Sequence, residues 1–330
     1  MTQSDFDPKP SVMVGDTADI SIHRSMAVLR SEGVNPVVSV VFVSTGSGIF
    51  CGINEVKALL GKVLPESNRS VWALQEGSEV NQGEIALVIT APYSSFALYE
   101  TAISGILSNC TGWATASREC VNAAGSIPVI STGANLVHPG VAGTMDYSAV
   151  IGGCVSCSTS LGGKLSIINP TGGISPNAVL LMGDPVRAMQ NFDKNMPQEI
   201  PRMCPVNIMK DEIEEALSLA KVLGQRLRGI VLDTGSDSSP NKVKELRARL
   251  ELAGYAHIEI FLKGDLTPQS IGQYVDQGIA VSAFGVSNYI GSAMPKEFKA
   301  QINEVDGQPF SRRGVLPGPS INARLVQVIQ

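Results

Sequence analysis

Three stretches near the C-terminus decide the fold: RGIVLDTGSDSSPNK (Arg228 to Lys242), HIEIFLKGDL (His257 to Leu266) and AVSAFGVSN (Ala280 to Asn288). Each contains an apolar run that breaks into a loop of small residues, and residues 243–253 and 268–277 between them have helical patterns. Uniformly apolar strands that alternate with amphipathic helices indicate parallel strands buried on both faces. In such folds the loops at the carboxyl ends of the strands form the binding site. We therefore expect the functional residues in these loops.

The alternation of strands and helices begins near the middle of the chain. Apolar runs at residues 127–132, 145–151, 178–183 and 203–208 precede the three C-terminal strands. Together they predict six or seven parallel strands, a number that favours a closed α/β barrel over an open sheet. No GxGxxG motif follows the first predicted strand, residues 37–43, so the sequence gives no support to a dinucleotide-binding fold.

Composition excludes several classes of partner. The formal charge of −5 and the pI near 5.3 give no sign of a nucleic-acid or membrane-surface partner. No apolar run has the length of a membrane span, and the N-terminal MTQSDFDPKP lacks the apolar core of a signal peptide. We expect a cytoplasmic protein.

Six cysteines are present, and two of them, Cys154 and Cys157, form a CxxC motif. A zinc site would need a second pair of ligands, and the sequence offers no matching pair. A redox motif would need a thioredoxin-like setting, which the surrounding sequence does not suggest. We expect all six to be buried, reduced thiols.

Several segments together resemble the nicotinate phosphoribosyltransferase family, particularly its short archaeal-type members. Their order and spacing carry the resemblance over nearly the whole chain. The segments are TADISIHRSMAVLRSEG (17–33), PYSSFALYETAISGIL (92–107), HPGVAGTMDYSAVIGGC (138–154), LDTGSDSS (232–239), AFGVSNYIGSAMPKEF (283–298) and QPFSRRG (308–314).

The resemblance implies the type II phosphoribosyltransferase fold, an irregular α/β barrel with an N-terminal α/β layer to which the C-terminal tail returns. The first ten residues are polar and are expected to form a mobile tail. On the family pattern residues 11–112 with 290–330 form the layer, and residues 113–289 form the barrel. It also implies a homodimer or higher oligomer. The implied reaction transfers phosphoribosyl from phosphoribosyl pyrophosphate to nicotinate, with Mg²⁺ on the leaving pyrophosphate.

Candidate site residues follow from the matched positions and from the needs of the reaction, which are cations and backbone N–H groups for phosphate. The catalytic candidates are His138, Asp146 and Asp233. The candidates for binding substrate or phosphate are Arg24, Asn135, Lys164, Asn177, Ser236, Lys263, Gly264, Gly285 and Ser287. No side-chain metal site is predicted.

The match departs from the family pattern at the predicted strand ends. Asn135 and Leu136 stand where family members carry an Arg-His pair before His138, and Asn177 stands at the position of a phosphorylatable His. The loop after Asp233 lacks the usual Arg pair, and Lys263-Gly264-Asp265 replaces a Ser-Gly-Gly cradle. Asn135 and Asn177 carry no positive charge, but their amides can hydrogen-bond a neutral heterocycle or amide.

Four of the candidates also have a structural alternative. Asp233 can cap its own serine-rich loop, and His138 before Pro139 can serve as a hydrogen-bonded structural side chain. Arg24 and Lys164 are equally compatible with solvated surface charges.

Two functions from different classes remain open at this point. The first is a phosphoribosyltransferase that acts on nicotinate or a related heterocycle, with Mg²⁺ and a phosphoribosyl pyrophosphate or nucleotide-like ligand. The second is a non-catalytic derivative that keeps the scaffold, needs no cofactor and binds a protein partner as a regulatory or assembly factor. The departures at the strand ends fit a changed substrate or lost chemistry.

Asn177 yields a first prediction. An amide is not a usable nucleophile toward ATP, so no phospho-enzyme should form at this position. Incubation with γ-labelled ATP should leave the protein unlabelled. Stable label that survives the Asn177→Ala substitution would show that the phosphorylated residue lies elsewhere.

Overall fold

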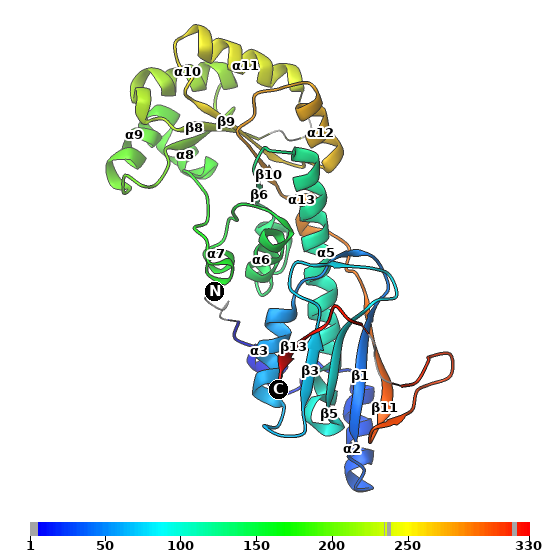
Figure 1. Cartoon of the computed structure of the whole chain (residues 1–330). Coiled ribbons are helices and arrows are strands. Elements are labelled where there is room, and N and C mark those ends of the chain that lie inside the picture. Colours follow the sequence, from blue (N-terminus) through cyan, green and yellow to red (C-terminus); the bar gives the residue numbers. More distant parts are fainter. Residues whose placement is uncertain (1–5, 234, 236–238, 319–321) are drawn as a thin grey trace. The chain divides into compact units, whose positions relative to one another are not determined.

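A computed structural model describes residues 6–233, 235, 239–318 and 322–330 (Figure 1). The chain divides into two compact units, one formed by Met1–Thr115 with Met294–Gln330 and the other by Ala116–Ala293. Ser236, one of the candidate phosphate ligands, lies outside the described residues.

The first unit is built on a six-stranded antiparallel sheet. The strand order is β12-β11-β1-β5-β3-β13. The strands are β1 (Val37–Ser44), β3 (Ser70–Ala73), β5 (Ile85–Pro92), β11 (Phe298–Val305), β12 (Gln308–Pro309) and β13 (Val326–Ile329). Because β11, β12 and β13 come from the C-terminal tail, the return of the tail to the N-terminal layer is confirmed.

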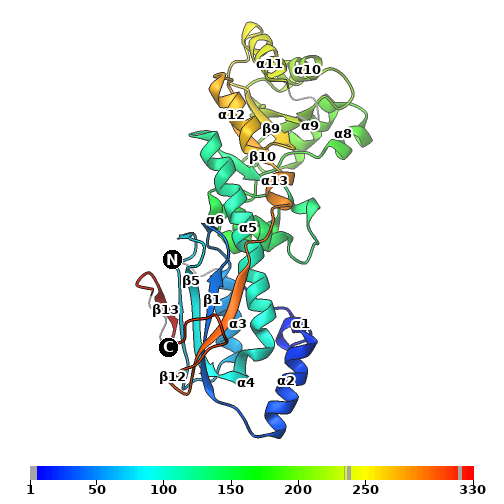
Figure 2. The ribbon, with the colours of Figure 1, turned by 90° about the vertical axis from the view of Figure 1, so that its right-hand side faces the viewer.

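Helices cover the apolar face of this sheet. Helix α3 (Ile53–Val63) contributes Val56, Leu59 and Leu60 to the core, and α5 (Glu100–Ala124) contributes Ile103 and Leu107 (Figure 2). The other elements of this unit are α1 (Pro10–Met13), α2 (Ile20–Ser31), α4 (Tyr93–Phe96), η1 (Ala97–Tyr99) and the paired strands β2 (Gly48–Ile49) and β4 (Glu79–Val80).

The second unit contains the predicted parallel sheet, in the order β6-β10-β9-β8-β7. Its strands are β6 (Val129–Ser131), β7 (Met203–Val206), β8 (Gly229–Asp233), β9 (Glu259–Gly264) and β10 (Ala283–Val286). The helices between them are α10 (Glu212–Leu223), α11 (Pro240–Leu252) and α12 (Pro268–Asp276), and Figure 1 shows α10 and α11 along one side of β8 and β9. The mixed α/β class is confirmed. No pairing joins β6 to β7 among the described residues, so barrel closure stays a prediction.

Two runs that the sequence predicted as strands are helices. Residues 145–151 lie in α6 (Ala142–Gly152), and residues 178–182 lie in α8 (Pro176–Met182). Helix α6 is buried on most of its surface and therefore shows no amphipathic period that would distinguish it from a buried strand. Helix α8 has the signals of a helix, with Ser175 at the N-cap, Pro176 in the first turn and Gly183 after the last.

The remaining elements of the second unit are short. They are η2 (Ala134–Leu136), α7 (Ser160–Ser166), α9 (Pro185–Asn195), η3 (Gly224–Arg226) and α13 (Asn288–Gly291). All six cysteines of the chain are free and buried, as predicted. None of the helices in the described part of the chain is both long and apolar enough to cross a membrane.

One buried carboxyl group in the first unit makes stability depend on pH. Burial raises the pKa of Glu55 to about 7, with Lys9 opposing the shift and the Glu76 carboxylate adding to it. Its Oε2 atom is buried without a hydrogen-bond partner among the described residues. The folded protein thus holds this proton more tightly than the unfolded chain, and stability falls as pH rises from 4.5 through 7.

Replacing Glu55 with Gln should remove the loss of stability at high pH. Urea unfolding should show that Glu55→Gln raises the free energy of unfolding by up to about 3 kcal/mol at about pH 8. At about pH 5 the substitution should leave the free energy of unfolding nearly unchanged. The exposed Glu66→Gln substitution is the control and should change neither value. An equal effect of Glu55→Gln at both pH values would contradict the assignment.

Candidate functional site

The alternation of side chains along the parallel strands creates two different faces. Register pairs place Pro205 beside Val231, Val231 beside Phe261, and Lys263 beside both Asp233 and Gly285. The opposite face is packed with fully buried side chains such as Ile230, Ile260, Leu262 and Phe284. The first face is partly open, because Val231, Phe261 and Lys263 are only half-buried.

A cavity of about 220 Å³ lies on the open face. Ile130, Met203, Pro205, Val231 and Phe261 give it apolar walls. Its polar lining comes from Thr132, Lys263 and the loop of residues 171–176. The cavity is smaller than the roughly 300–1,000 Å³ typical of drug-sized pockets and is suited to a single ring.

Two glycines shape the cavity by letting neighbouring side chains approach the backbone. A Cβ atom on Gly229 would lie 2.7 Å from the ring of Phe261, and one on Gly285 would lie 2.9 Å from Cβ of Lys263. Both distances are shorter than real side chains allow, so larger residues would displace Phe261 or Lys263. Gly285 was predicted as a site residue, whereas Gly229 was missed because its role depends on a ring from another strand.

Five predicted residues come together at the carboxyl ends of β8, β9 and β10. Lys263 Nζ lies 3.5 Å from Asp233 Oδ2. Gly264 has a φ of +135°, which favours glycine, and its carbonyl oxygen accepts a 2.7 Å hydrogen bond from Ser287 Oγ. Gly285 lies between β6 and Lys263. This group supplies one cation, one carboxylate and accessible backbone.

Asp233 also closes its own loop, as the structural alternative predicted. Its Oδ1 atom accepts a 3.2 Å hydrogen bond from the backbone N–H of Gly235. Its side chain is nevertheless 58 % exposed, so the carboxylate remains accessible at the strand end.

Asp146 occupies a different setting. It is fully buried on α6 and accepts hydrogen bonds of 2.7 Å from Ser131 Oγ, and of 2.9 and 2.7 Å from the backbone N–H and Oγ1 of Thr159. These contacts connect the end of β6 to the N-cap of α7. The geometry therefore gives Asp146 a positioning role in the loops around β6.

The remaining predicted residues that the structure describes are exposed on the surfaces of their units. His138 is exposed, and its Nδ1 accepts a hydrogen bond from the backbone N–H of Gly140. Asn135, Lys164 and Asn177 are exposed on η2, α7 and α8. Arg24 is exposed on α2 in the first unit. Their roles as ligands stay predictions.

The segments that follow the parallel strands contain more acidic than basic residues in the sequence. The connections that leave the five strand ends are residues 132–141, 207–211, 234–239, 265–267 and 287. The sequence of these connections contains one basic residue, Lys210, and the acidic residues Asp211, Asp237 and Asp265. Lys210 is paired with Glu214 at 2.5 Å. The strand ends add Asp233 and Lys263, which pair with each other.

Comparisons with known proteins identify the family. The model of the quinolinate phosphoribosyl transferase N-terminal domain matches residues 19–111, and that of the C-terminal domain matches residues 113–299. The chain belongs to this family. The predicted relationship to phosphoribosyltransferases of NAD biosynthesis is thereby confirmed at the family level.

Individual relatives agree with this assignment. A nicotinate-nucleotide pyrophosphorylase structure from Pyrococcus furiosus is 32 % identical, with a TM-score of 0.86, and the match covers 97 % of this chain and 82 % of that one. The nicotinate phosphoribosyltransferase pncB2 of Mycobacterium tuberculosis is 26 % identical over 67 % of this chain and 48 % of its own length. The human nicotinic acid phosphoribosyltransferase, at 15 % identity and a TM-score of 0.68 over 91 % of this chain and 77 % of that one, shares the fold. The chain spans about half the length of the curated relatives it matches.

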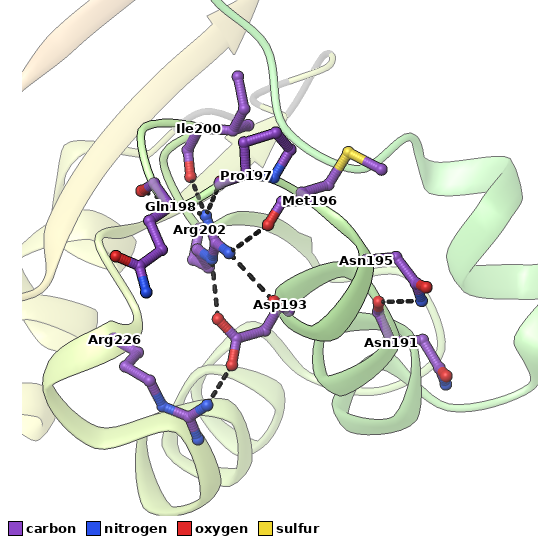
Figure 3. Close-up of polar contacts among 9 residues, drawn as sticks. All are labelled: Asn191, Asp193, Asn195, Met196, Pro197, Gln198, Ile200, Arg202 and Arg226. Carbon is purple, nitrogen blue, oxygen red and sulfur yellow. Dashed lines mark hydrogen bonds and ion pairs between the residues drawn. The ribbon is translucent and has the colours of Figure 1, made fainter.

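A buried arginine holds the segment that leads into β7. Arg202 is 7 % exposed, and its guanidinium donates to the carboxylate of Asp193 and to carbonyl oxygens of residues 193, 196, 197, 198 and 200 (Figure 3). Arg226 contacts the other oxygen of Asp193 from the surface. Because Met203 follows directly and lines the cavity, this network fixes one wall of the site.

Arg202 and Arg226 form a matched pair for a test of this network. Arg202→Met should lower the free energy of unfolding by about 3 kcal/mol, because it removes the donor from several main-chain carbonyls and from one oxygen of the Asp193 carboxylate. Arg226→Met removes an arginine that is 63 % exposed and should cost less than about 1 kcal/mol. Urea unfolding measures both. Similar losses for the two variants would refute the distinction.

Proposed function

We propose that this family member binds phosphoribosyl pyrophosphate at the carboxyl ends of β8, β9 and β10 and transfers the phosphoribosyl group to nicotinate or a related heterocycle. The observation that carries the proposal is the convergence of Asp233, Lys263 and Gly264 beside a ring-sized apolar cavity. Ligands bind at the carboxyl ends of parallel strands in α/β folds, and this family acts in NAD biosynthesis.

Each residue at the strand ends would contact a different part of phosphoribosyl pyrophosphate. Lys263 supplies a cation for phosphate oxygens, and Gly264 leaves its backbone open to a close approach because it has no side chain. Ser287 fixes the Gly264 carbonyl by donating a hydrogen bond to it. Asp233 presents an exposed carboxylate that can accept hydrogen bonds from the ribose hydroxyls.

The strand ends supply part of the ligand set for a Mg²⁺ ion. Among the described residues, no group of three or more His, Cys, Asp or Glu side chains is placed to hold a metal ion. Mg²⁺ is commonly held by one or two carboxylates together with substrate phosphates, and Asp233 supplies such a carboxylate. When bound there with the donor, the ion would neutralise charge on the departing pyrophosphate.

The cavity suits the acceptor. Phe261 and the apolar side chains of β7 and β8 offer a dry surface to a planar ring, and Lys263 stands at the end of the cavity nearest the donor. The ring nitrogen would then face the anomeric carbon of a donor held at the strand ends. Proximity of this kind supplies much of the rate enhancement in group transfer.

A second candidate function is a non-catalytic derivative that binds a ligand or protein without turnover. It is favoured by the acidic strand ends, where the connecting loops contain no arginine and the two lysines are paired with carboxylates. Loss of planar, bidentate arginine contacts weakens phosphate binding and transition-state stabilisation.

We also propose a homodimer or higher symmetric oligomer. Leu180, Leu181 and Met182 on α8 expose 52 %, 88 % and 36 % of their surface. Neighbouring apolar side chains exposed on one short helix are typical of a surface that packs against another chain.

Donor binding tests the proposal. Calorimetric titration with phosphoribosyl pyrophosphate and Mg²⁺ should give binding that requires Mg²⁺, because the strand ends alone are acidic. Lys263→Ala should weaken it by about 10-fold or more, the loss of one charge-assisted contact, and Lys263→Arg should retain most of it. Lys244→Ala on the exposed face of α11 is the control.

Mass spectrometry of the reaction mixture then separates the two candidates. Formation of a mononucleotide from nicotinate that is lost in Asp233→Ala supports the enzyme. Donor binding without any product supports the non-catalytic derivative. Absence of donor binding at millimolar concentration would overturn the proposed site.

A further inference from the structure

We propose that Phe261 sets the size limit of the acceptor. Its phenyl ring closes the cavity on the side of the amino ends of β8 and β9, so that a single six-membered heterocycle fits and a fused pair of rings does not. Gly229, which lies under the phenyl ring, is the positioning residue that lets Phe261 take this place. The inference rests on the proposed function, because it takes the cavity as the acceptor site.

The side chain of Phe261 leans toward the amino end of the neighbouring strand. Phe261 is paired in register with Val231, yet its ring lies over Gly229, which precedes Val231 on the same face of β8. A Cβ atom on Gly229 would lie 2.7 Å from Cε2 of the ring and 3.1 Å from Cδ2. The ring therefore lies on the side of the cavity away from the strand ends that hold Lys263.

Burial along this face of the sheet changes at the level of the phenyl ring. Val231 and Phe261 line the cavity and are half-buried. Gly229 and its register partner Met203, which lie nearer the amino ends, are buried. Gly229 has no side chain of its own, so it is the ring of Phe261 that covers it. The cavity thus ends against Phe261 in the direction of the amino ends.

The volume of the cavity fits one substituted ring. It is about 220 Å³, whereas an apolar cavity of about 150 Å³ already binds benzene. A heterocycle whose nitrogen faces a donor at the strand ends would point its opposite edge toward Phe261. A second ring fused to that edge would then meet the phenyl ring, and a packed wall resists added atoms.

Gly229 controls the position of the phenyl ring because the other close contact at this point is main chain. A Cβ atom on Gly229 would also lie 2.9 Å from the carbonyl oxygen of Glu259, which belongs to the backbone of β9. This carbonyl cannot yield without distorting the sheet, so the phenyl ring is the group that would move. Moving away from Gly229 would carry the ring into the cavity and make the cavity shallower.

Equilibrium binding of two heterocycles to the full chain, measured without donor, tests the size limit. The probes are nicotinate and the isoquinoline carboxylate that results from fusing a benzene ring to the edge of nicotinate opposite its nitrogen. Both carry one nitrogen and one carboxylate, so they differ in size and not in charge. Nicotinate should bind at least about 10-fold more tightly than the isoquinoline. Equal or tighter binding of the isoquinoline would overturn the proposal.

A substitution at Phe261 should change the preference. Phe261→Leu shortens the wall and should improve binding of the isoquinoline relative to nicotinate by at least about 5-fold. Phe284→Leu is the matched control, because Phe284 is fully buried on the opposite face of the adjacent strand β10. The control should lower stability without changing the ratio of the two affinities. An unchanged ratio in Phe261→Leu, or an equal change in Phe284→Leu, would overturn the proposal.

Gly229→Ala tests the positioning role. It should weaken nicotinate binding about 10-fold, because the phenyl ring would enter the cavity. Combining it with Phe261→Leu should restore binding, since the smaller side chain leaves room for the added methyl group. A loss of binding that the second substitution does not reverse would show that Gly229 acts on the sheet and not through Phe261.

Because the two heterocycles are measured without donor, the two proposals fail separately. Loss of donor binding would defeat the proposed phosphoribosyl transfer and leave the size limit to be decided by the two heterocycles. Donor binding together with an unchanged ratio in Phe261→Leu would support the donor site and overturn the role of Phe261.

Discussion

The parallel register of β8, β9 and β10 is the constraint on which the candidate site depends. Side chains on successive residues of a strand point to opposite faces, so burial of Ile230, Leu262 and Phe284 on one face places Val231, Phe261 and Lys263 on the other. A shift of one residue in β9 would bury Lys263 and expose Leu262. The stability of the sheet therefore fixes the position of the groups that face the ligand.

The cavity beside these strands depends on close packing at places remote from one another in the sequence. Gly229 admits the ring of Phe261, Gly285 admits the stem of Lys263, and Arg202 holds the segment before β7 through main-chain carbonyls. Each contact joins two or more chain segments. The shape of the cavity is thus set by backbone positions as much as by the side chains that line it.

The charge at the strand ends distinguishes this chain from a simple anion-binding site. Lys263 and Lys210 each have a carboxylate partner, and three further acidic residues follow the strands. A polyanionic donor can approach such a surface only with its charge neutralised. This balance of charge fits a change of ligand or a loss of turnover, and both agree with a scaffold retained from the family.

The sequence by itself determined the mixed α/β class, the three C-terminal parallel strands and the residues Asp233, Lys263, Gly264, Gly285 and Ser287 at their ends, because apolar strands and small-residue loops have local signatures. Residues 145–151 and 178–182 became helices because a short apolar run does not reveal which element buries it. Only the tertiary structure decided that Asp146 is fully hydrogen-bonded in the interior, that Arg202 caps a loop and that the Thr132 hydroxyl is buried without a partner among the described residues. These roles depend on backbone groups and neighbours brought together by folding, and such contacts leave no pattern in the order of the residues.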